Sequence, residues 1–274
     1  MNIIILAILA VTVIGIICAV MLAFASKVMA VKTDETAVKL REALPGANCG
    51  ACGYPGCDGY AAALGEKSGV KTNLCIPGGD AVSKELSLIL GVDFEDVEEK
   101  IAVVHCLGDC DATSDRINYQ GVETCAAAKL LGGKGVCSDG CIGFGDCVAV
   151  CPNDAVCMEK GLARVDTRKC TGCGICVGAC PNKIITLERD TIKTAILCSG
   201  RDKGAVARKK CTKGCIACKK CVRECPVQAF VIENNLAVID YAICTDCGRC
   251  TEVCPVKCIS LCDYAGVHKV KGGA

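Results

Sequence analysis

The 274-residue sequence has no tryptophan and few other aromatic residues, which together make up 3% of the chain. A core built on large aromatic side chains is therefore excluded. Part of the stability must come from something other than a large apolar core. The net charge of +1 gives no information about partners, and nothing indicates nucleic-acid binding. The motifs GxGxxG after a strand and GxxxxGK[ST] are also missing, so no flavin, nicotinamide or nucleotide site is predicted.

Cysteine, in contrast, is present in large excess, with 29 residues in the chain. A cysteine content above roughly 8–10% marks either a disulfide scaffold or a metal protein. Disulfide scaffolds are usually short and secreted, and their cysteines do not cluster as CxxCxxC. Clusters of that kind occur here, as in CTGCGIC at 170–176, so the sequence favours a metal protein.

The N-terminal residues 3–25 contain no charged side chain, and Thr12 is the clearly polar one. About 20 such residues predict a transmembrane helix. A cleaved signal peptide is the alternative, but its apolar core would span only ~7–15 residues and follow a basic stretch. Because Lys27 and Lys32 come after the run, the positive-inside rule predicts a single-pass protein of the cell inner membrane, with its bulk in the cytoplasm.

The first cysteine region has the spacing CxxC, then four residues, then a long gap. Short amphipathic helices are predicted on both sides of it. We expect a small helical module folded around one cluster, with a structural zinc site as the alternative. Its predicted ligands are Cys49, Cys52, Cys57 and Cys75.

The second and third cysteine regions are copies of each other, offset by 74 residues. In each copy a hairpin pattern, AVCMEKGLARVD or AFVIENNLAVID, lies between two cysteine runs that end in Cys-Pro. This is the plan of bacterial two-cluster ferredoxins, in which the fourth cysteine of each run binds the other run's [4Fe–4S] cluster. That crossing rule predicts three complete sets: Cys215, Cys218, Cys221 and Cys254; Cys244, Cys247, Cys250 and Cys225; and Cys170, Cys173, Cys176 and Cys151.

One run departs from the pattern, because Phe144 stands where a cysteine is expected. The remaining ligands of its cluster would be Cys141, Cys147 and Cys180. Cys137 is the nearest spare thiol, so we predict that it completes this set. A three-cysteine [3Fe–4S] site is the alternative. With Cys137 included, the chain is expected to carry five [4Fe–4S] clusters.

Several cysteines remain outside these sets. Free cysteine often behaves as a small buried hydrophobe, and the alternative is a further metal site or a redox pair, such as Cys198 with Cys211. His105 beside Cys106 suggests a metal, although a lone histidine is more often structural. The remaining cysteines are Cys18, Cys106, Cys110, Cys125, Cys157, Cys198, Cys211, Cys258 and Cys262.

Basic residues are concentrated between Lys183 and Arg223, with twelve Lys or Arg against three Asp or Glu. Such a surface could dock an acidic ferredoxin and raise the encounter rate. An ordinary solvated face that offsets the negative charge of the clusters is the alternative.

Taken together, the apolar N-terminus, CGACGYPGC, GCIGFGDCVAVCP and CTGCGICVGACP resemble the B subunit of the Rnf ion-translocating oxidoreductase complex. The resemblance implies that reduced ferredoxin delivers electrons, which pass to NAD through other subunits, named A, C, D, E and G, while sodium ions or protons are moved across the membrane. It also implies that this subunit is an electron carrier without catalytic acid or base residues. The alternatives are an electron-transfer subunit of a hydrogenase or formate dehydrogenase, and a zinc-binding interaction protein.

The expected fold class is α+β. Four divisions are predicted: a transmembrane anchor over 1–27, a single-cluster module over 33–92, and two-cluster ferredoxin-like regions over 100–190 and 191–265.

Overall fold

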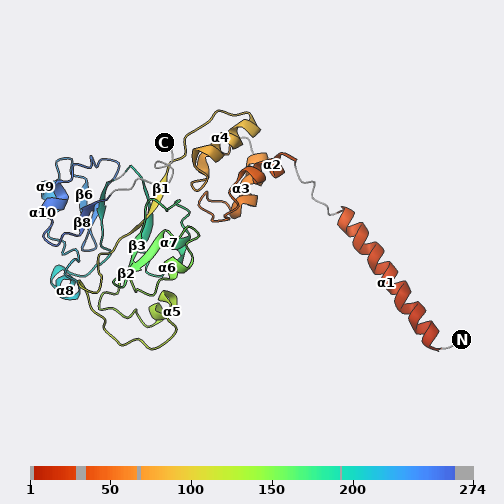
Figure 1. Cartoon of the computed structure of the whole chain (residues 1–274), viewed down its shortest axis with the longest axis horizontal. Helices are drawn as coiled ribbons and strands as arrows, with labels where there is room; N and C mark the ends of the chain where they lie inside the picture. Colours follow the sequence, from red (N-terminus) through yellow and green to blue (C-terminus); the bar gives the residue numbers. More distant parts are fainter. Residues whose placement is uncertain (1–2, 29–34, 67–68, 192, 263–274) are drawn as a thin grey trace.

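The computed structural model describes residues 3–28, 35–66, 69–191 and 193–262 (Figure 1). The ends of the predicted divisions at residues 1–2, 33–34 and 263–265 lie outside this part of the chain. The described part combines helices and short strands, as an α+β fold requires.

The apolar N-terminal run forms α1 (Ile3–Val28), a helix of 26 residues. The prediction that this helix crosses a membrane is wrong. Within the described residues, no helix is both long enough and apolar enough to cross a membrane. The fold class is therefore corrected to an α+β chain without the single N-terminal transmembrane helix.

Three helices and a 3-10 turn follow α1 and enclose a small core of their own. Leu40, Tyr60 and Leu86 are at most 1% exposed in this core, one from each helix. Gly91 ends the last helix in the left-handed conformation, a common way to terminate a helix. The elements are α2 (Glu35–Ala43), α3 (Gly56–Glu66), η1 (Thr72–Leu74) and α4 (Gly79–Leu90).

The next unit contains two antiparallel strand pairs, of which β2–β3 is the predicted hairpin and β1–β4 joins the two ends of the unit. Lys160 and Gly161 form the hairpin turn with positive φ angles, which an αL turn between twisted strands requires. The elements are β1 (Lys100–Val104), α5 (Cys125–Leu130), α6 (Asp146–Ala149), β2 (Val156–Glu159), β3 (Leu162–Val165), α7 (Ile175–Ala179) and β4 (Ile185–Arg189).

The last unit repeats this arrangement, with β5 paired to β8 and the predicted hairpin β6–β7 between them. Its hairpin turns at Asn234 and Asn235, also with positive φ angles. The elements are β5 (Thr194–Ile196), α8 (Gly204–Lys210), α9 (Lys220–Glu224), β6 (Phe230–Glu233), β7 (Leu236–Ile239), α10 (Arg249–Val253) and β8 (Ile259–Leu261).

His105 joins the two repeated units. Its Nδ1 atom lies 2.7 Å from the carbonyl oxygen of Ile196 in the last unit, and its Nε2 atom lies 2.7 Å from Thr186 Oγ1 in its own unit. Ser199 Oγ donates a further hydrogen bond to the His105 carbonyl at 2.9 Å. His105 is therefore a structural residue at the junction, and both ring nitrogens are already occupied by protein contacts.

The helical module contacts the first repeated unit at Gly172, which lies between two predicted ligands. Gly172 has φ +65°, and a Cβ atom there would lie 2.1 Å from the Lys100 carbonyl oxygen and 2.9 Å from Ile76 Cγ2. Only glycine fits such a close approach. The loop that carries Cys170 and Cys173 therefore lies directly against the residue that follows Cys75.

Candidate metal centres

The helical module brings its four predicted ligands together around the N-terminus of α3. Asn48 Oδ1 accepts a hydrogen bond from the Cys57 backbone N–H at 2.8 Å, which fixes the loop to the helix start. Burial raises the pKa of the Cys75 thiol to about 11, and the charges of Cys57, Cys49 and Cys52 add to the rise. The other three thiols therefore lie within electrostatic range of Cys75, as one cluster would require.

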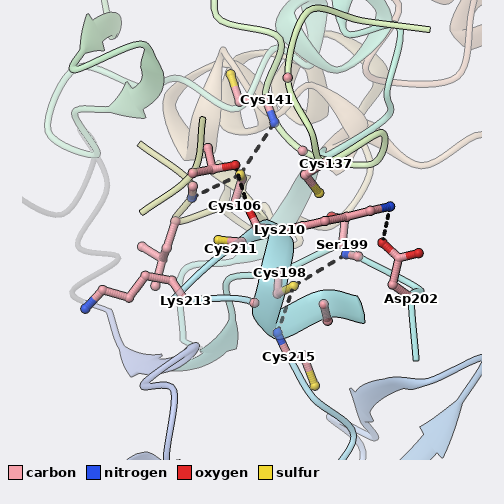
Figure 2. Close-up of a pocket in the computed structure, with 18 of the residues that line it drawn as sticks. Cys106, Cys137, Cys141, Cys198, Ser199, Asp202, Lys210, Cys211, Lys213 and Cys215 are labelled. Carbon is pink, nitrogen blue, oxygen red and sulfur yellow. Dashed lines mark hydrogen bonds and ion pairs between the residues drawn. The ribbon is translucent and has the colours of Figure 1, made fainter. Parts of the chain in front are cut away.

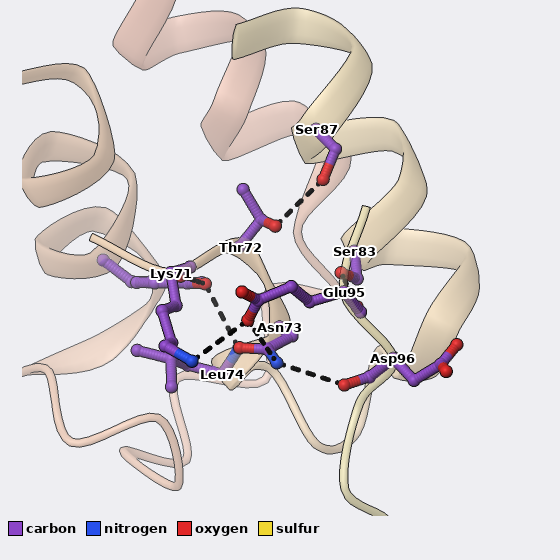
Figure 3. A network of polar contacts seen from close by, with 9 residues as sticks. Lys71, Thr72, Asn73, Leu74, Ser83, Ser87, Glu95 and Asp96 are labelled. Carbon is purple, nitrogen blue, oxygen red and sulfur yellow. Dashed lines mark hydrogen bonds and ion pairs between the residues drawn. The ribbon is translucent and has the colours of Figure 1, made fainter. Parts of the chain in front are cut away.

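A network of polar contacts holds the 3-10 turn immediately before Cys75 (Figure 3). Thr72 Oγ1 lies 2.9 Å from Ser87 Oγ on α4, and Asn73 Nδ2 donates to Glu95 Oε2 and to the Asp96 carbonyl oxygen, both at 3.1 Å. Because these contacts connect the turn to α4 and to the segment after it, the position of Cys75 does not depend on the cysteine loop alone.

Three predicted sets in the repeated units also come together. Burial raises the pKa of Cys176, Cys221 and Cys250 to about 11, and other members of the same predicted set add to each rise. Two of the sets line cavities of about 330 and 260 Å³. The three sets are Cys151, Cys170, Cys173 and Cys176; Cys215, Cys218, Cys221 and Cys254; and Cys225, Cys244, Cys247 and Cys250.

Backbone N–H groups point at several of these sulfurs. Ala155 N–H donates to Cys151 Sγ and Ala229 N–H donates to Cys225 Sγ, both at 3.3 Å, in equivalent positions of the two copies. Ala102 N–H donates to Cys170 Sγ at 3.4 Å. Hydrogen bonds of this kind favour the thiolate form and tune the potential of an iron–sulfur cluster.

A different thiol from the predicted one lies beside the altered run. A cavity of about 370 Å³ is lined by Cys141, Cys147, Cys180 and Cys125, while Cys137 is not among its lining residues. Burial raises the pKa of Cys147 to about 12, and the charges of these same three cysteines add to the rise. The structure therefore places Cys125, and not Cys137, beside the incomplete set.

Cys125 reaches this position on a segment that the second copy lacks. Thirty residues separate Cys106 from Cys137, whereas twelve separate Cys198 from Cys211. The extra residues form a loop and the short helix α5, which begins at Cys125. Phe144, the residue in place of the missing cysteine, packs against Tyr119 of this loop with ring centroids 5.3 Å apart. The sequence did contain a signal for Cys125, because the copy that lacks a cysteine in its run is also the copy that carries an insertion with an additional cysteine.

Curated relatives were found over most of the chain. The chain is 39% identical to the B subunit of the proton-translocating ferredoxin:NAD(+) oxidoreductase complex of Clostridium ljungdahlii, over 100% of this chain and 95% of the relative. It is 42% identical to the B subunit of the Na(+)-translocating complex of Acetobacterium woodii, over 90% of this chain and 74% of the relative. The chain belongs to this B-subunit family. A third relative, the B subunit of the ion-translocating oxidoreductase complex of Methanosarcina acetivorans, is 39% identical over 90% of this chain and 94% of its own length.

Family models agree with the B-subunit assignment and with the cofactor. Residues 44–77 match a model described as "Putative Fe-S cluster", residues 163–186 match a 4Fe-4S binding domain, and residues 214–258 match a 4Fe-4S dicluster domain. The predicted cofactor, [4Fe–4S] clusters, is therefore confirmed. The zinc-binding alternative and the hydrogenase or formate dehydrogenase alternatives are not supported.

The donor sets in this B subunit fit [4Fe–4S] clusters. Each offers four thiols, the usual ligand number, around a cavity or a loop–helix junction. Within the described part of the chain, no three His, Cys, Asp or Glu side chains converge closely enough for a single metal ion. Thiols around one zinc ion would need sulfur atoms about 3.8 Å apart, given a Zn–S bond of about 2.3 Å.

One additional thiol lies against a complete set. The Cys258 Sγ atom is 3.7 Å from Cys254 Sγ, and the Cys258 side chain is 1% exposed. A hydrogen bond from Cys258 lowers the pKa of Cys254 to about 5 and that of Cys215 to about 6. By the 74-residue offset its counterpart is Ile184, which is 2% exposed. Cys258 is therefore a core residue whose single thiol proton can be donated to Cys254 or to Cys215, both predicted ligands.

Three other cysteines lie away from the cavities. Cys157 on β2, Cys110 in the inserted segment and Cys18 on α1 are all exposed. Cys110 Sγ donates to the Lys160 carbonyl oxygen at 2.9 Å. None of these three thiols lines a cavity with other cysteines in the described part of the chain.

Proposed function

We propose that this chain is the electron-carrying subunit of an ion-translocating ferredoxin:NAD(+) oxidoreductase complex. In this role it accepts electrons from reduced ferredoxin and delivers them to the other subunits, towards NAD reduction. The observation that supports the proposal most strongly is the set of four-cysteine groups in a chain whose relatives carry that name. No group in the chain is required to act as a catalytic acid, base or nucleophile.

The proposed ligands form five sets, in which Cys125 replaces Cys137 as the fourth ligand of the altered run. This replacement is supported by the shared cavity and by the electrostatic contacts of Cys147. The sets are Cys49, Cys52, Cys57 and Cys75; Cys125, Cys141, Cys147 and Cys180; Cys151, Cys170, Cys173 and Cys176; Cys215, Cys218, Cys221 and Cys254; and Cys225, Cys244, Cys247 and Cys250.

A [4Fe–4S] cluster, when bound, takes up and releases single electrons at a potential set by nearby charge, hydrogen bonds to sulfur and exposure. The protein residues control these three quantities. Backbone N–H groups donate to Cys151, Cys170 and Cys225, and the buried hairpins exclude water from one side of each ferredoxin-like unit. Because the thiols must lose their protons to bind iron, cluster assembly and folding are coupled.

The surface around Cys218 is the proposed docking site for ferredoxin. Cys218 is exposed, and Lys219 and Lys220, which follow it in the chain, are exposed as well. The exposed Lys213 and the basic last turn of α8 add further positive charge to the same unit. An acidic ferredoxin would be steered towards such a surface, and the attraction would weaken with salt.

We also propose the location and division of the chain. The cluster-binding units would work at the cytoplasmic face of the inner membrane, where the other subunits of such a complex reside. The module is assigned to residues 33–92 and the ferredoxin-like units to 100–190 and 191–265, a division supported by their separate buried cores.

Anaerobic reduction of the purified full-length chain tests this function. Reduced ferredoxin is mixed with the chain in a stopped-flow spectrometer, and the bleaching of the cluster absorbance is followed at two salt concentrations. We expect rapid reduction that slows as salt increases. A brown, cluster-containing chain that low-potential ferredoxin does not reduce would contradict the proposed donor, and a colourless chain that contains zinc would contradict the electron-carrying function.

A further inference from the structure

A cavity between the two ferredoxin-like units is lined by four cysteines that belong to none of the five sets (Figure 2). They are Cys106, Cys137, Cys198 and Cys211. The cavity volume is about 600 Å³, compared with 260 to 370 Å³ for the three cavities that hold complete sets. By the same measure, which includes space open to solvent, the junction cavity is no smaller than the cavities lined by the complete sets.

The four thiols are related by the internal repeat. Cys106 lies two residues after the end of β1, and Cys198 lies two residues after the end of β5. Cys137 and Cys211 are separated by the repeat offset of 74 residues, and each precedes a ligand of a complete set by four residues. Each copy therefore contributes one pair of thiols, and neither copy alone contains the four.

The two strand-end sulfurs accept backbone hydrogen bonds in the same pattern. Cys106 Sγ accepts from Gly108 N–H at 3.3 Å and from Cys141 N–H at 3.5 Å. Cys198 Sγ accepts from Gly200 N–H at 3.4 Å and from Cys215 N–H at 3.3 Å. Cys151 and Cys225 each accept one backbone hydrogen bond, and the two donors aimed at each of Cys106 and Cys198 likewise favour a thiolate ligand.

The other two sulfurs lie close to that of Cys106. A Cβ atom on Gly108 would be 3.5 Å from Cys106 Sγ and 3.7 Å from Cys211 Sγ. A Cβ atom on Gly140 would be 3.4 Å from Cys137 Sγ and 3.7 Å from Cys106 Sγ. Cys106 thus has both Cys137 and Cys211 nearby. Figure 2 shows the four sulfurs around one space, while the sulfurs of Cys141 and Cys215 point away from it.

Hydrogen bonds from distant parts of the sequence fix the walls of this cavity. Thr113 Oγ1 donates to the Lys210 carbonyl oxygen at 2.8 Å, and Thr212 N–H donates to the Ala112 carbonyl oxygen at 2.9 Å. Lys210 in turn is paired with Asp202 at 2.7 Å. The thiols are therefore held in place by both units rather than by one flexible loop.

We propose that Cys106, Cys137, Cys198 and Cys211 bind a sixth [4Fe–4S] cluster at the junction of the two ferredoxin-like units. The proposal rests on the proposed electron-carrying function. Cys141 and Cys215 are ligands of the flanking sets, and their backbone N–H groups donate to the junction sulfurs. The junction sulfurs therefore contact the backbone of a proposed cluster ligand on each side, which makes this site the link between the two units.

Iron and acid-labile sulfide counts on the anaerobically purified full-length chain test the proposal, together with Mössbauer spectra. Six clusters predict about 24 iron atoms per chain, and five predict about 20. Cys198→Ala and Cys211→Ala are each expected to lose about one to four irons, the smaller loss with the EPR signal of an oxidised three-iron centre. Cys157→Ala, which removes an exposed thiol on β2, is the matched control and is expected to keep the wild-type count.

The outcomes separate the two proposals. A wild-type chain with about 20 irons, and the same count in both variants, would overturn the junction cluster but leave the proposed function intact. Zinc retained by the wild type and lost by both variants would also overturn it. A wild type without iron and sulfide would overturn the proposed function itself. The iron count of the wild-type chain decides the question by itself. The test therefore remains valid even if a variant fails to fold.

Discussion

The Asp146 carboxylate accepts a hydrogen bond from the Cys125 backbone N–H at 2.8 Å. Its second oxygen accepts from the Ala126 N–H at 3.0 Å. Asp146 is the residue before Cys147, so this contact joins the altered cysteine run directly to the start of the inserted helix α5. The cysteine run in which Phe144 replaces a cysteine is thus connected to the inserted segment that contains Cys125.

Removal of Cys125 tests the reassigned ligand. We expect Cys125→Ala to lose about one to four irons, because one corner of the cubane loses its thiolate. Cys110→Ala is the matched control, since Cys110 lies in the same inserted segment but donates to the Lys160 carbonyl oxygen. Iron analysis and EPR of the anaerobic chain give the readout. Identical iron counts for Cys125→Ala and the control would contradict the assignment.

The double variant Cys125→Ala/Cys137→Ala separates the two candidate thiols. If they serve different clusters, each single variant changes one centre, and the double variant changes two. If Cys137 were the fourth ligand of the altered run, as the sequence predicted, Cys137→Ala would remove that centre and Cys125→Ala would leave the spectrum unchanged. Mössbauer spectra of the three variants, fitted with the wild-type components, distinguish these patterns.

Asp146 is expected to act as a positioning residue. Asp146→Ala leaves two N–H groups at the start of α5 without their acceptor, a loss comparable to that of an N-cap, about 1 kcal/mol. The cluster next to it should then be lost faster in the presence of an iron chelator, while the other centres keep their wild-type rates. Asp146→Asn retains one acceptor oxygen and should recover part of the protection. Equal chelation rates in the wild type and Asp146→Ala would refute this role.

The Cys258 hydrogen bond predicts a difference in potential. Cys258→Ile introduces the residue found at the equivalent position of the first unit and removes the donor to Cys254 and Cys215. Loss of a hydrogen bond worth about 1 kcal/mol should lower the potential of a one-electron centre on the order of 40 mV. The reciprocal variant Ile184→Cys should raise the potential of the set that contains Cys180. EPR-monitored redox titrations measure both shifts, and an unchanged or higher potential in Cys258→Ile would contradict the expectation.

Charge reversal tests the docking surface. The double variant Lys219→Glu/Lys220→Glu should slow reduction by ferredoxin at low salt by about tenfold, and the difference should shrink as salt screens the attraction. Lys129→Glu, on α5 away from α9 (Figure 1), changes the charge of a single exposed site and serves as the control. Stopped-flow rates across a salt series provide the measurement. A reduction rate that the double variant leaves unchanged would place the docking site elsewhere.

Local patterns predicted much of the fold. The hairpins β2–β3 and β6–β7 followed from apolar residues around Lys160–Gly161 and Asn234–Asn235, and the repeat offset related the two units. The apolar run at residues 3–25 predicted a helix correctly, but the described helix does not meet the requirement for a membrane crossing.

The cysteine groups of the candidate site were harder to predict from the sequence where their residues come from different units. Spacing alone grouped Cys170, Cys173 and Cys176, because neighbouring ligands share one loop. Spacing could not group Cys125 with Cys141, Cys147 and Cys180, because Cys125 lies within the inserted segment. Its position depends instead on the hydrogen bonds to Asp146. Cys106 and Cys198 lie at equivalent strand ends, but the cavity that they share exists only when the two units pack together.

The central claim is that the cysteines of this chain hold a continuous series of iron–sulfur clusters that ferredoxin can reduce. The most direct measurement is an anaerobic coulometric titration of the full-length chain with reduced ferredoxin as mediator. The account predicts an uptake of about six electrons per chain, one for each [4Fe–4S] cluster. A chain that takes up no electrons from ferredoxin, although it is fully folded and loaded with iron, would contradict it.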